Sequence, residues 1–372
     1  MNKKHPMPQA LKYVQQGNSN SDIQSPRHCR IMVIGVGGAG NNTVTRLTKR
    51  GTPGAECIAV NTDAIHLQVS NADKKILIGE KLTRGLGVGG DPKLGRAAIE
   101  ESHKRVKELL TDVDIAFITA GLGGGTGTGA APVIAEMARR GGSVTIGVVT
   151  TPFRIEKGRI QYANQALKEM QKKCDTVVVL DNNKLLQLAP QLPINEAFQV
   201  ADQVLANMIK GITETISAPS LINLDFADFR TIVRRSGVAV VGVGESDSPN
   251  RAEEAVRKAL TSPLLDVDYA GATGALIHVS GGTQMTIEEA NRVGEIITEM
   301  MDDDALVIWG ARVDPKLNGR LKVTLLMTGV KSPQLLTGFG DIAPQLYNLE
   351  PYAKPEKKLD IDLNLYQMEN IQ

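Results

Sequence analysis

Cysteine is scarce in this sequence: the 372 residues include three, Cys29, Cys57 and Cys174. They are widely spaced, odd in number and form no C-x-x-C pair, so the sequence suggests neither a disulfide framework nor a cysteine zinc site. Free thiols persist in reducing compartments, and we therefore expect this protein to act in the cytoplasm.

A surplus of charge and a long apolar run are also missing. The 42 Lys and Arg residues nearly balance the 41 Asp and Glu residues, which leaves a formal net charge of +1. Proteins built mainly to grip nucleic-acid backbones carry excess positive charge, so we expect no nucleic-acid partner. No apolar stretch approaches the length of a membrane span, and residues 1–22 lack the apolar core of a signal peptide. We therefore expect a soluble chain without direct membrane insertion.

Alternating strand and helix patterns fill most of the chain. Hydrophobic residues make up 42% of it, and its length suits two domains with separate cores. The alternation predicts an α/β fold with a mostly parallel sheet, followed by a long helix and a second α/β unit. Strands are expected at 31–34, 57–63, 74–79, 114–120, 143–153, 176–183, 238–244, 275–280, 305–313 and 321–329. Helices are expected at 96–110, from near Ala130, at 195–217, from near Ser248, and after the capping-box pair Thr286 and Glu289.

Changes of pattern along the chain predict its domain boundaries. The polar N-terminal segment with three prolines is typical of a flexible leader, and a proline-containing stretch near the C-terminus is typical of an extended linker. The predicted units are a leader at 1–27, a nucleotide-binding domain at 28–194, a central helix at 195–218, a C-terminal domain at 219–330, and a flexible linker with a tail peptide at 331–372.

The first glycine cluster, "GVGGAG" at 35–40, lies between a strand and a helix. It satisfies G-x-G-x-x-G, and Asp63 ends the next strand about where a ribose-binding acid would lie. The mechanism is general, because bare glycines let backbone N–H groups approach a phosphate at a helix N-terminus. A dinucleotide site, another phosphate site and a tight turn without a ligand all remain open on this motif alone.

The second cluster, "AGLGGGTGTGAAPV" at 120–133, has six glycines among the nine positions 121–129. A strand and a helix flank it, so it is not a slack linker. It contains no lysine, which excludes the ordinary P-loop. We predict an anion-binding concavity of backbone N–H groups and the Thr126 and Thr128 hydroxyls, with a metal ion, Mg²⁺, offsetting the phosphate charge.

The stretch "GGGTGTGAAPVIA" closely resembles the signature of the tubulin and FtsZ superfamily. This version of the signature is similar to that of the FtsZ family, the cell-division GTPases of prokaryotes. "VIGVGGAGNN", "AVNTD", "TRGLGVGG", "TTPF", "AFQVADQVL" and "LINLDFADFRTI" follow in the family's order, so the resemblance covers about residues 28–331. The "RGLGVGG" loop, "IWGARVDP" and the tail are more similar to archaeal members. The resemblance implies a Rossmann-like GTPase domain, a central helix and a smaller α/β domain with a mixed sheet.

The resemblance also implies the residues that bind GTP and GDP. Phosphate contacts would come from Gly37, Gly38, Ala39, Gly40, Asn41, Gly124, Gly125, Thr126, Gly127 and Thr128. Asn61, Thr62, Asp63 and the loop 85–90 would lie near the γ-phosphate, Glu156 and Arg159 near the ribose, and Phe198, Asn182 and Asp202 at the base. A carboxylate can accept two hydrogen bonds from guanine, and adenine lacks that donor pair, so Asp202 would select GTP over ATP. Without the resemblance, Asp202 could equally be a polar position on the long helix.

"LDFAD" carries the implied catalytic acids, Asp225 and Asp228, with Asn223 just before them. By themselves these acids would be helix caps. In the family they reach the γ-phosphate of a neighbouring subunit and position the attacking water, so the site is complete only when two subunits stack. Such a head-to-tail contact generates an open homopolymer, here the protofilaments of the division ring at the inner face of the membrane.

Three positions depart from the family pattern. The segment after Phe153 is one residue short, so Arg159 is the best match for the family's arginine; Asp91 stands where an asparagine is usual; and the tail "LDIDLNLY" only partly matches the peptide that binds membrane tethers. The shortened segment and Asp91 keep open the alternative of a non-catalytic family member that regulates or scaffolds a filament. A second alternative, an NAD(P)-dependent oxidoreductase, rests on "GVGGAG" and Asp63.

Overall fold

The computed structural model describes residues 29–52, 54–184, 193–217, 226–234, 239–261, 269 and 272–330. The predicted leader, the linker and tail, and the implied catalytic residues Asn223 and Asp225 lie outside the described residues. Within the described part, no helix combines the length and apolarity needed to span a bilayer.

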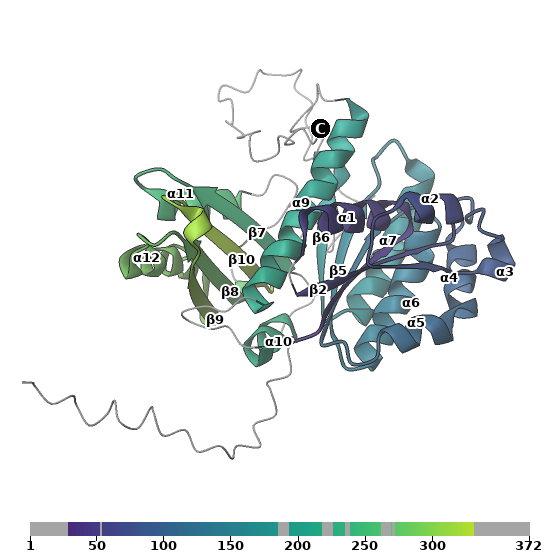
Figure 1. The fold of residues 1–372 in the computed structure, drawn as a ribbon, viewed down its shortest axis with the longest axis horizontal. Helices are drawn as coiled ribbons and strands as arrows, with labels where there is room; N and C mark the ends of the chain where they lie inside the picture. Colours follow the sequence, from purple (N-terminus) through teal and green to yellow (C-terminus); the bar gives the residue numbers. More distant parts are fainter. Residues whose placement is uncertain are drawn as a thin grey trace, which may run out of the picture.

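The N-terminal sheet has six parallel strands in the order β3-β2-β1-β4-β5-β6. The strands are β1 (Ile31–Val36), β2 (Ala55–Asn61), β3 (Lys74–Leu77), β4 (Ile115–Gly121), β5 (Val144–Thr151) and β6 (Thr176–Asp181). Helices cover both faces (Figure 1), which explains why β1 and β5 are buried at every position and mostly apolar, rather than alternating between buried and exposed. Along β1, Ile31 and Val33 pack toward α1 and α9, whereas Met32 and Ile34 pack toward α6.

Helices alternate with these strands along the chain. They are α1 (Gly37–Arg50), α2 (Ala64–Val69), α3 (Glu80–Thr83), α4 (Pro92–Glu101), α5 (His103–Leu109), α6 (Thr126–Arg140) and α7 (Lys157–Lys173). The α/β fold with a parallel sheet is thereby confirmed, and its strand order reverses between β1 and β4. Open α/β sheets bind ligands at such a reversal, at the carboxyl ends of the strands.

A second sheet follows α9 (Ile194–Ser217) and α10 (Phe226–Arg234). Its order is β7-β10-β8-β9, and it is mixed, because β10 is antiparallel to β7 and β8 whereas β8 and β9 are parallel. The remaining elements are β7 (Ala239–Ser246), α11 (Arg251–Leu260), β8 (Ala272–Gly281), α12 (Ile287–Thr298), β9 (Met301–Val313), η2 (Pro315–Leu317) and β10 (Leu321–Thr328). Figure 1 shows α9 running between the two sheets, as expected of a central helix.

Three helix boundaries differ from those expected from the sequence. The helix expected at 96–110 is broken at Ser102, whose hydroxyl accepts a hydrogen bond from the Gly79 N–H at 3.1 Å. Helix α6 begins at Thr126 instead of near Ala130. Helix α11 begins at Arg251, after Asn250, rather than near Ser248. The capping box of Thr286 with its glutamate three residues later is confirmed.

Candidate nucleotide-binding site

The two glycine clusters meet where α1 and α6 begin. Gly37 has a φ of +72°, and a β-carbon on it would lie 2.9 Å from the backbone nitrogen of Gly127. A β-carbon on Gly40 would lie 2.3 Å from the carbonyl oxygen of Thr119, at the end of β4. The glycines are required here because two helix N-termini approach each other at backbone distance. Both termini direct N–H groups and partial positive charge toward the same region, which favours an anion.

The threonine hydroxyls of the second cluster stabilise the cluster itself. Thr126 and Thr62 share a hydrogen bond of 2.7 Å between their hydroxyls, and the Thr128 hydroxyl accepts one from the Gly123 N–H at 2.8 Å. Both threonine side chains are buried. These bonds shape the loop, and the hydroxyl of Thr128, which only accepts here, still has its own O–H to donate. The prediction that these hydroxyls join the backbone N–H groups as ligand donors stays a prediction.

Glycines at the mouth of the site differ from those beneath it. A β-carbon on Gly124, Gly89 or Gly90 would meet no atom within 4 Å, whereas one on Gly125 would meet the Val88 side chain at 2.4 Å. One on Gly129 would lie 2.1 Å from the Pro92 carbonyl oxygen. The deeper glycines allow α6 to pack against α4, and the outer ones border open space that a ligand could fill.

The segment after β2 and the start of α4 border the phosphate side. Asp63 caps α2 by accepting from the His66 N–H at 3.0 Å, and Asp91 caps α4 by accepting from the Lys93 N–H at 2.8 Å. Asn61 accepts from the next backbone N–H with its side-chain oxygen. The Asn41 side chain is fully buried, and its neighbours assign the orientation of its amide: with the nitrogen toward the Gly35 carbonyl oxygen it donates there at 2.8 Å, and its oxygen accepts from Asn61. These polar residues therefore set the loop geometry.

The proposed base side is formed by α1, α9 and the segment after β5. The rings of Phe153 and Phe198 make an edge-to-face contact with centroids 5.4 Å apart, and Phe198 remains 42% exposed. Asp202 is buried, with Oδ2 3.4 Å from Nε of Arg46. Burial raises the pKa of Asp202 to about 6, which Arg46 and Thr43 only partly oppose. The sequence motifs included Phe153 without a role and left out Arg46 and Thr43, although both lie on α1, the helix that the first glycine cluster opens.

The proposed ribose side lies at the start of α7. Glu156 accepts a hydrogen bond from the Phe153 N–H at 3.0 Å and forms an ion pair with Arg159. A β-carbon on Gly123 would lie 3.0 Å from the β-carbon of Arg159, so this arginine flanks the second glycine cluster despite the shortened segment. Asn182, half-buried, directly follows β6. The structure thus brings residues 156, 159 and 182 to the same end of the sheet as the glycine clusters.

Asp228 is placed elsewhere. It lies in the first turn of α10, half-buried, and α10 packs against β5 and β8. Figure 1 shows α10 at the lower edge of the molecule, well away from α1 and α2 at its upper edge. Asp228 therefore does not join the glycine clusters of its own subunit.

Comparison with known proteins follows the same division of the chain. The Tubulin/FtsZ family GTPase-domain model matches residues 30–190, and the FtsZ family C-terminal-domain model matches residues 237–331. Cell division protein FtsZ 2 of Methanocaldococcus jannaschii is 55% identical over 310 residues, which are 82% of each chain. The chain belongs to the FtsZ family. FtsZ 1 of Pyrococcus furiosus is 50% identical over 337 residues, 90% of this chain and 88% of that one. An empty FtsZ dimer from M. jannaschii matches with a TM-score of 0.77 at 49% identity, covering 86% of this chain and 91% of that one.

Membership in the FtsZ family confirms the prediction of a GTPase of the cell-division type, with a site for GTP and GDP. The relatives named are archaeal, in agreement with the archaeal character of the sequence motifs. The oxidoreductase alternative fails, because the G-x-G-x-x-G cluster belongs to the matched GTPase domain. Among the described residues, no group of three His, Cys, Asp or Glu side chains gathers as metal ligands would.

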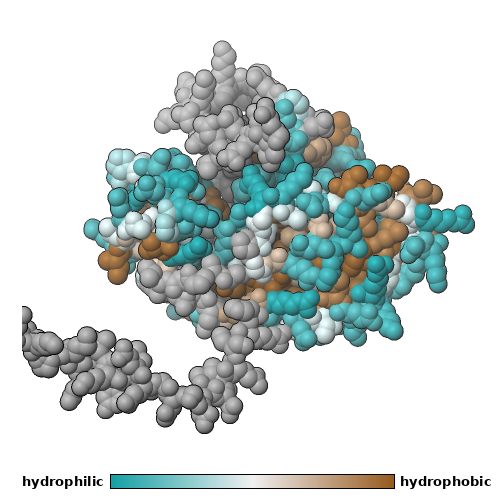
Figure 2. Space-filling view, in the orientation of Figure 1, coloured by the Kyte–Doolittle hydropathy of each residue, from teal (hydrophilic) through white to brown (hydrophobic). Residues whose placement is uncertain are grey.

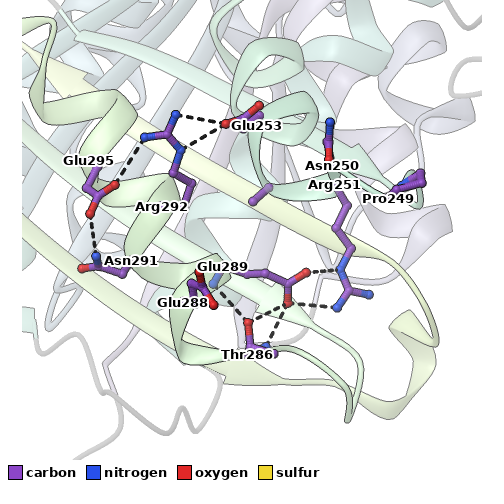
Figure 3. A pocket seen from close by; sticks show the side chains of 11 residues that line it. Pro249, Asn250, Arg251, Glu253, Thr286, Glu288, Glu289, Asn291, Arg292 and Glu295 are labelled. Atoms are coloured by element: carbon purple, nitrogen blue, oxygen red, sulfur yellow. Dashed lines mark hydrogen bonds and ion pairs between the residues drawn. The ribbon is translucent and has the colours of Figure 1, made fainter.

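A groove of about 500 Å³ between α11 and α12 lies in the other domain of this FtsZ-family chain. Figure 3 shows its charged side chains turned toward one another. Arg251 pairs with Glu289, and Arg292 bonds both Glu253 and Glu295. The pairs of Arg251 with Glu289 and of Arg292 with Glu253 join the two helices, and the groove contributes nothing to the nucleotide site.

Proposed function

We propose that this protein binds GTP between its two glycine clusters and hydrolyses it only where two subunits stack head to tail. The observation that carries the proposal is the position of Asp228, on a helix far from its own subunit's glycine clusters. Phosphoryl transfer depends mainly on positioning and charge stabilisation. An acid delivered by the next subunit, to orient the attacking water, makes hydrolysis conditional on assembly.

The base pocket supports guanine as the ligand. An ionised Asp202 accepts hydrogen bonds from the N1–H and 2-amino groups, and the Phe153 and Phe198 pair offers an aromatic surface for the ring. Glu156 and Asn182, which the resemblance assigns to the ribose and the base, follow the neighbouring strands β5 and β6. Arg159 belongs to the same end through its contact with Gly123.

Mg²⁺ fits this site. No lysine lies in either glycine cluster, and the donors near the proposed γ-phosphate are oxygens of Thr62, Asp63 and Asp91. Mg²⁺ takes oxygen ligands and usually keeps phosphate oxygens and waters with one or two carboxylates. Bound there, it would neutralise charge that develops on the phosphates. The chain's own part is to direct backbone N–H groups at the phosphates from two helix termini.

An exposed apolar surface beside the site supports the head-to-tail contact. Ile65 and Val69 on α2 are 73% and 74% exposed, and Leu86, in the loop after α3, is 82% exposed. Figure 2 shows apolar surface over this part of the molecule. Exposed apolar patches mark association surfaces, and here a second copy would cover the patch and the open nucleotide together. The contact is heterologous, and it propagates as a filament when its rotation does not close a ring.

The division ring at the inner face of the membrane is the proposed place of action, with tethers that bind the C-terminal tail. This part rests on the resemblance, since the tail lies outside the described residues. A pull-down of tail-deleted protein with membrane extracts from the source organism, compared with the full chain, tests whether the tail recruits such proteins.

The experiment that tests shared hydrolysis uses Asp228→Ala. Parent protein should pellet with GTP and Mg²⁺ but much less with GDP, and its GTPase rate per subunit should rise above a threshold concentration. Asp228→Ala should bind GTP with parental affinity, pellet with it, and release at least 100-fold less phosphate, since one catalytic positioning group is lost. Asp247→Ala, an exposed acid beyond β7, is the control.

Two results would contradict the proposal. Turnover independent of protein concentration would show that one subunit holds a complete site. Loss of GTP binding in Asp228→Ala, with folding intact, would place this acid in its own subunit's pocket. Parent protein that assembles without releasing phosphate would instead identify the non-catalytic family member.

A further inference from the structure

The phosphate side of the site has a side-chain donor outside the set that the family resemblance assigns: His66. It lies on α2 and is half-buried, with its backbone N–H bound by the Asp63 side chain at 3.0 Å. Its ring stands beside the first glycine cluster. A β-carbon on Gly38 would have Nε2 of His66 as its nearest neighbour, at 4.0 Å, and Gly38 itself is exposed. Nε2 therefore faces the open space over the cluster.

The hydrogen bonds of Asn61 determine which ring nitrogen of His66 carries the proton. The Asn61 oxygen accepts from the Thr62 N–H at 2.9 Å, so the Asn61 nitrogen is its donor end, and this nitrogen also donates to Asn41. It lies 3.4 Å from Nδ1 of His66. Nδ1 must therefore accept, and the neutral ring carries its proton on Nε2, the nitrogen that faces the cluster.

We propose that His66 donates a hydrogen bond from Nε2 to the γ-phosphate of bound GTP. This inference rests on the proposed function, since it needs GTP in the site. It adds a nitrogen donor beside the terminal phosphate, in a site whose glycine clusters contain no P-loop lysine. Because GDP has no γ-phosphate, His66 distinguishes the two nucleotides: it strengthens the binding of GTP and leaves the binding of GDP unchanged.

Two amide substitutions separate this role from support of the loop. His66→Asn places an amide oxygen near the Nδ1 position, where it can still accept from Asn61, but has no donor that reaches the phosphate. His66→Gln extends an N–H donor to the Nε2 position. Gln68→Ala, an exposed change on the same helix, is the matched control. Mant-GTP and mant-GDP are titrated with Mg²⁺ into each variant below the assembly threshold.

His66→Asn should weaken mant-GTP binding about tenfold, the loss expected for one hydrogen bond to a charged group, and change mant-GDP binding less than about twofold. His66→Gln should recover most of the loss. Equal weakening for both nucleotides would overturn the proposal, as would parental binding in His66→Asn. Nucleotide binding by the parent protein is measured first, because a parent that binds neither nucleotide would refute the proposed function itself. In ¹⁵N-histidine spectra of nucleotide-free protein, an Nδ1–H tautomer of His66 would also overturn it.

Discussion

At residue scale, the burial of Asp202 sets its proposed role in guanine recognition against the stability of the nucleotide-free protein. Its carboxylate is buried against α1 with one guanidinium nearby, and burial raises its pKa from 3.8 to about 6. In the folded protein the proton is therefore held more tightly than in the unfolded chain. The stability this adds is complete below about pH 4 and is lost as the pH rises through about 6. At neutral pH the Asp202 carboxylate is ionised and buried, which lowers the stability of the nucleotide-free protein. Guanine would donate hydrogen bonds to this carboxylate.

Asp202→Asn should accordingly stabilise the nucleotide-free protein and weaken its binding of GTP. At pH 8 the free energy of unfolding should rise, by at most about 3 kcal/mol, and the gain should shrink toward pH 5, where the parent residue is already protonated. GTP affinity should fall at least tenfold, because the amide presents a donor where two acceptors are needed. Urea unfolding and mant-GTP titration at both pH values measure these effects.

Glu196→Gln, which neutralises an exposed carboxylate on the same helix, is the control for Asp202→Asn and should change neither quantity. A lower unfolding free energy for Asp202→Asn at pH 8 would show that the pair with Arg46 outweighs the cost of burial.

At the scale of elements, the packing of α6 against α4 decides where the second glycine cluster is loop and where it is helix. From the sequence, a helix is expected to begin near Ala130, and the four Gly and Thr residues before it are poor helix formers. In the structure they form its first turn, since Gly129 lets the α4 backbone approach and Thr128 holds the preceding loop. Gly129 is needed here because it allows two helices to pack closely, and helix propensities do not take such contacts into account.

Two alanine substitutions should separate the packing glycines from those at the mouth. Gly129→Ala puts a β-carbon 2.1 Å from the Pro92 carbonyl oxygen, and it should cost about 1–3 kcal/mol of stability or more. Gly124→Ala meets no atom within 4 Å, and it should leave the unfolding free energy within about 0.5 kcal/mol of the parent while weakening GTP. Urea unfolding without nucleotide, then mant-GTP titration, measures both. Equal losses of stability would mean that Gly124 is also a packing position.

At the scale of the whole molecule, the separation of the nucleotide clusters from α10 predicts complementation between defective subunits. Gly124→Asp places a negative charge in the open mouth and should abolish GTP binding without harming the fold. Asp228→Ala should bind GTP without hydrolysing it. Mixed in equal amounts, the two should recover partial GTPase activity, because the pocket of one meets the intact α10 of the other. Phosphate release by each variant alone and by the mixture provides the measurement.

Activity no greater in the mixture than in the separate variants, with both folded and copelleting, would argue that each subunit hydrolyses its own nucleotide. A mixture with Asp228→Ala and parent provides the control for assembly, because the inactive subunits should lower the rate in proportion to the interfaces that they occupy.

Much of the fold could be predicted from sequence because parallel strands buried on both faces leave unbroken apolar runs, and helices leave their own spacing. The helix break at Ser102 could not be predicted in this way. Ser102 interrupts a regular helical pattern because its hydroxyl accepts a hydrogen bond from the Gly79 N–H, a partner distant in sequence. The site divides in the same way. Motifs located the glycine clusters, but the pairing of Arg46 with Asp202 joins residues 156 positions apart and depends on how α1 lies against α9.

By itself the sequence determined the alternation of strand and helix, the placement of glycine clusters after strands, and the motifs shared with FtsZ, because these depend on neighbouring residues and local spacing. Only the tertiary structure decided that Thr126 and Thr128 bond inward, that Asp202 is buried beside one arginine, and that His66 turns Nε2 toward Gly38. Such properties depend on the direction of a side chain relative to elements far away in the chain. That direction is set by packing, which a linear pattern does not record.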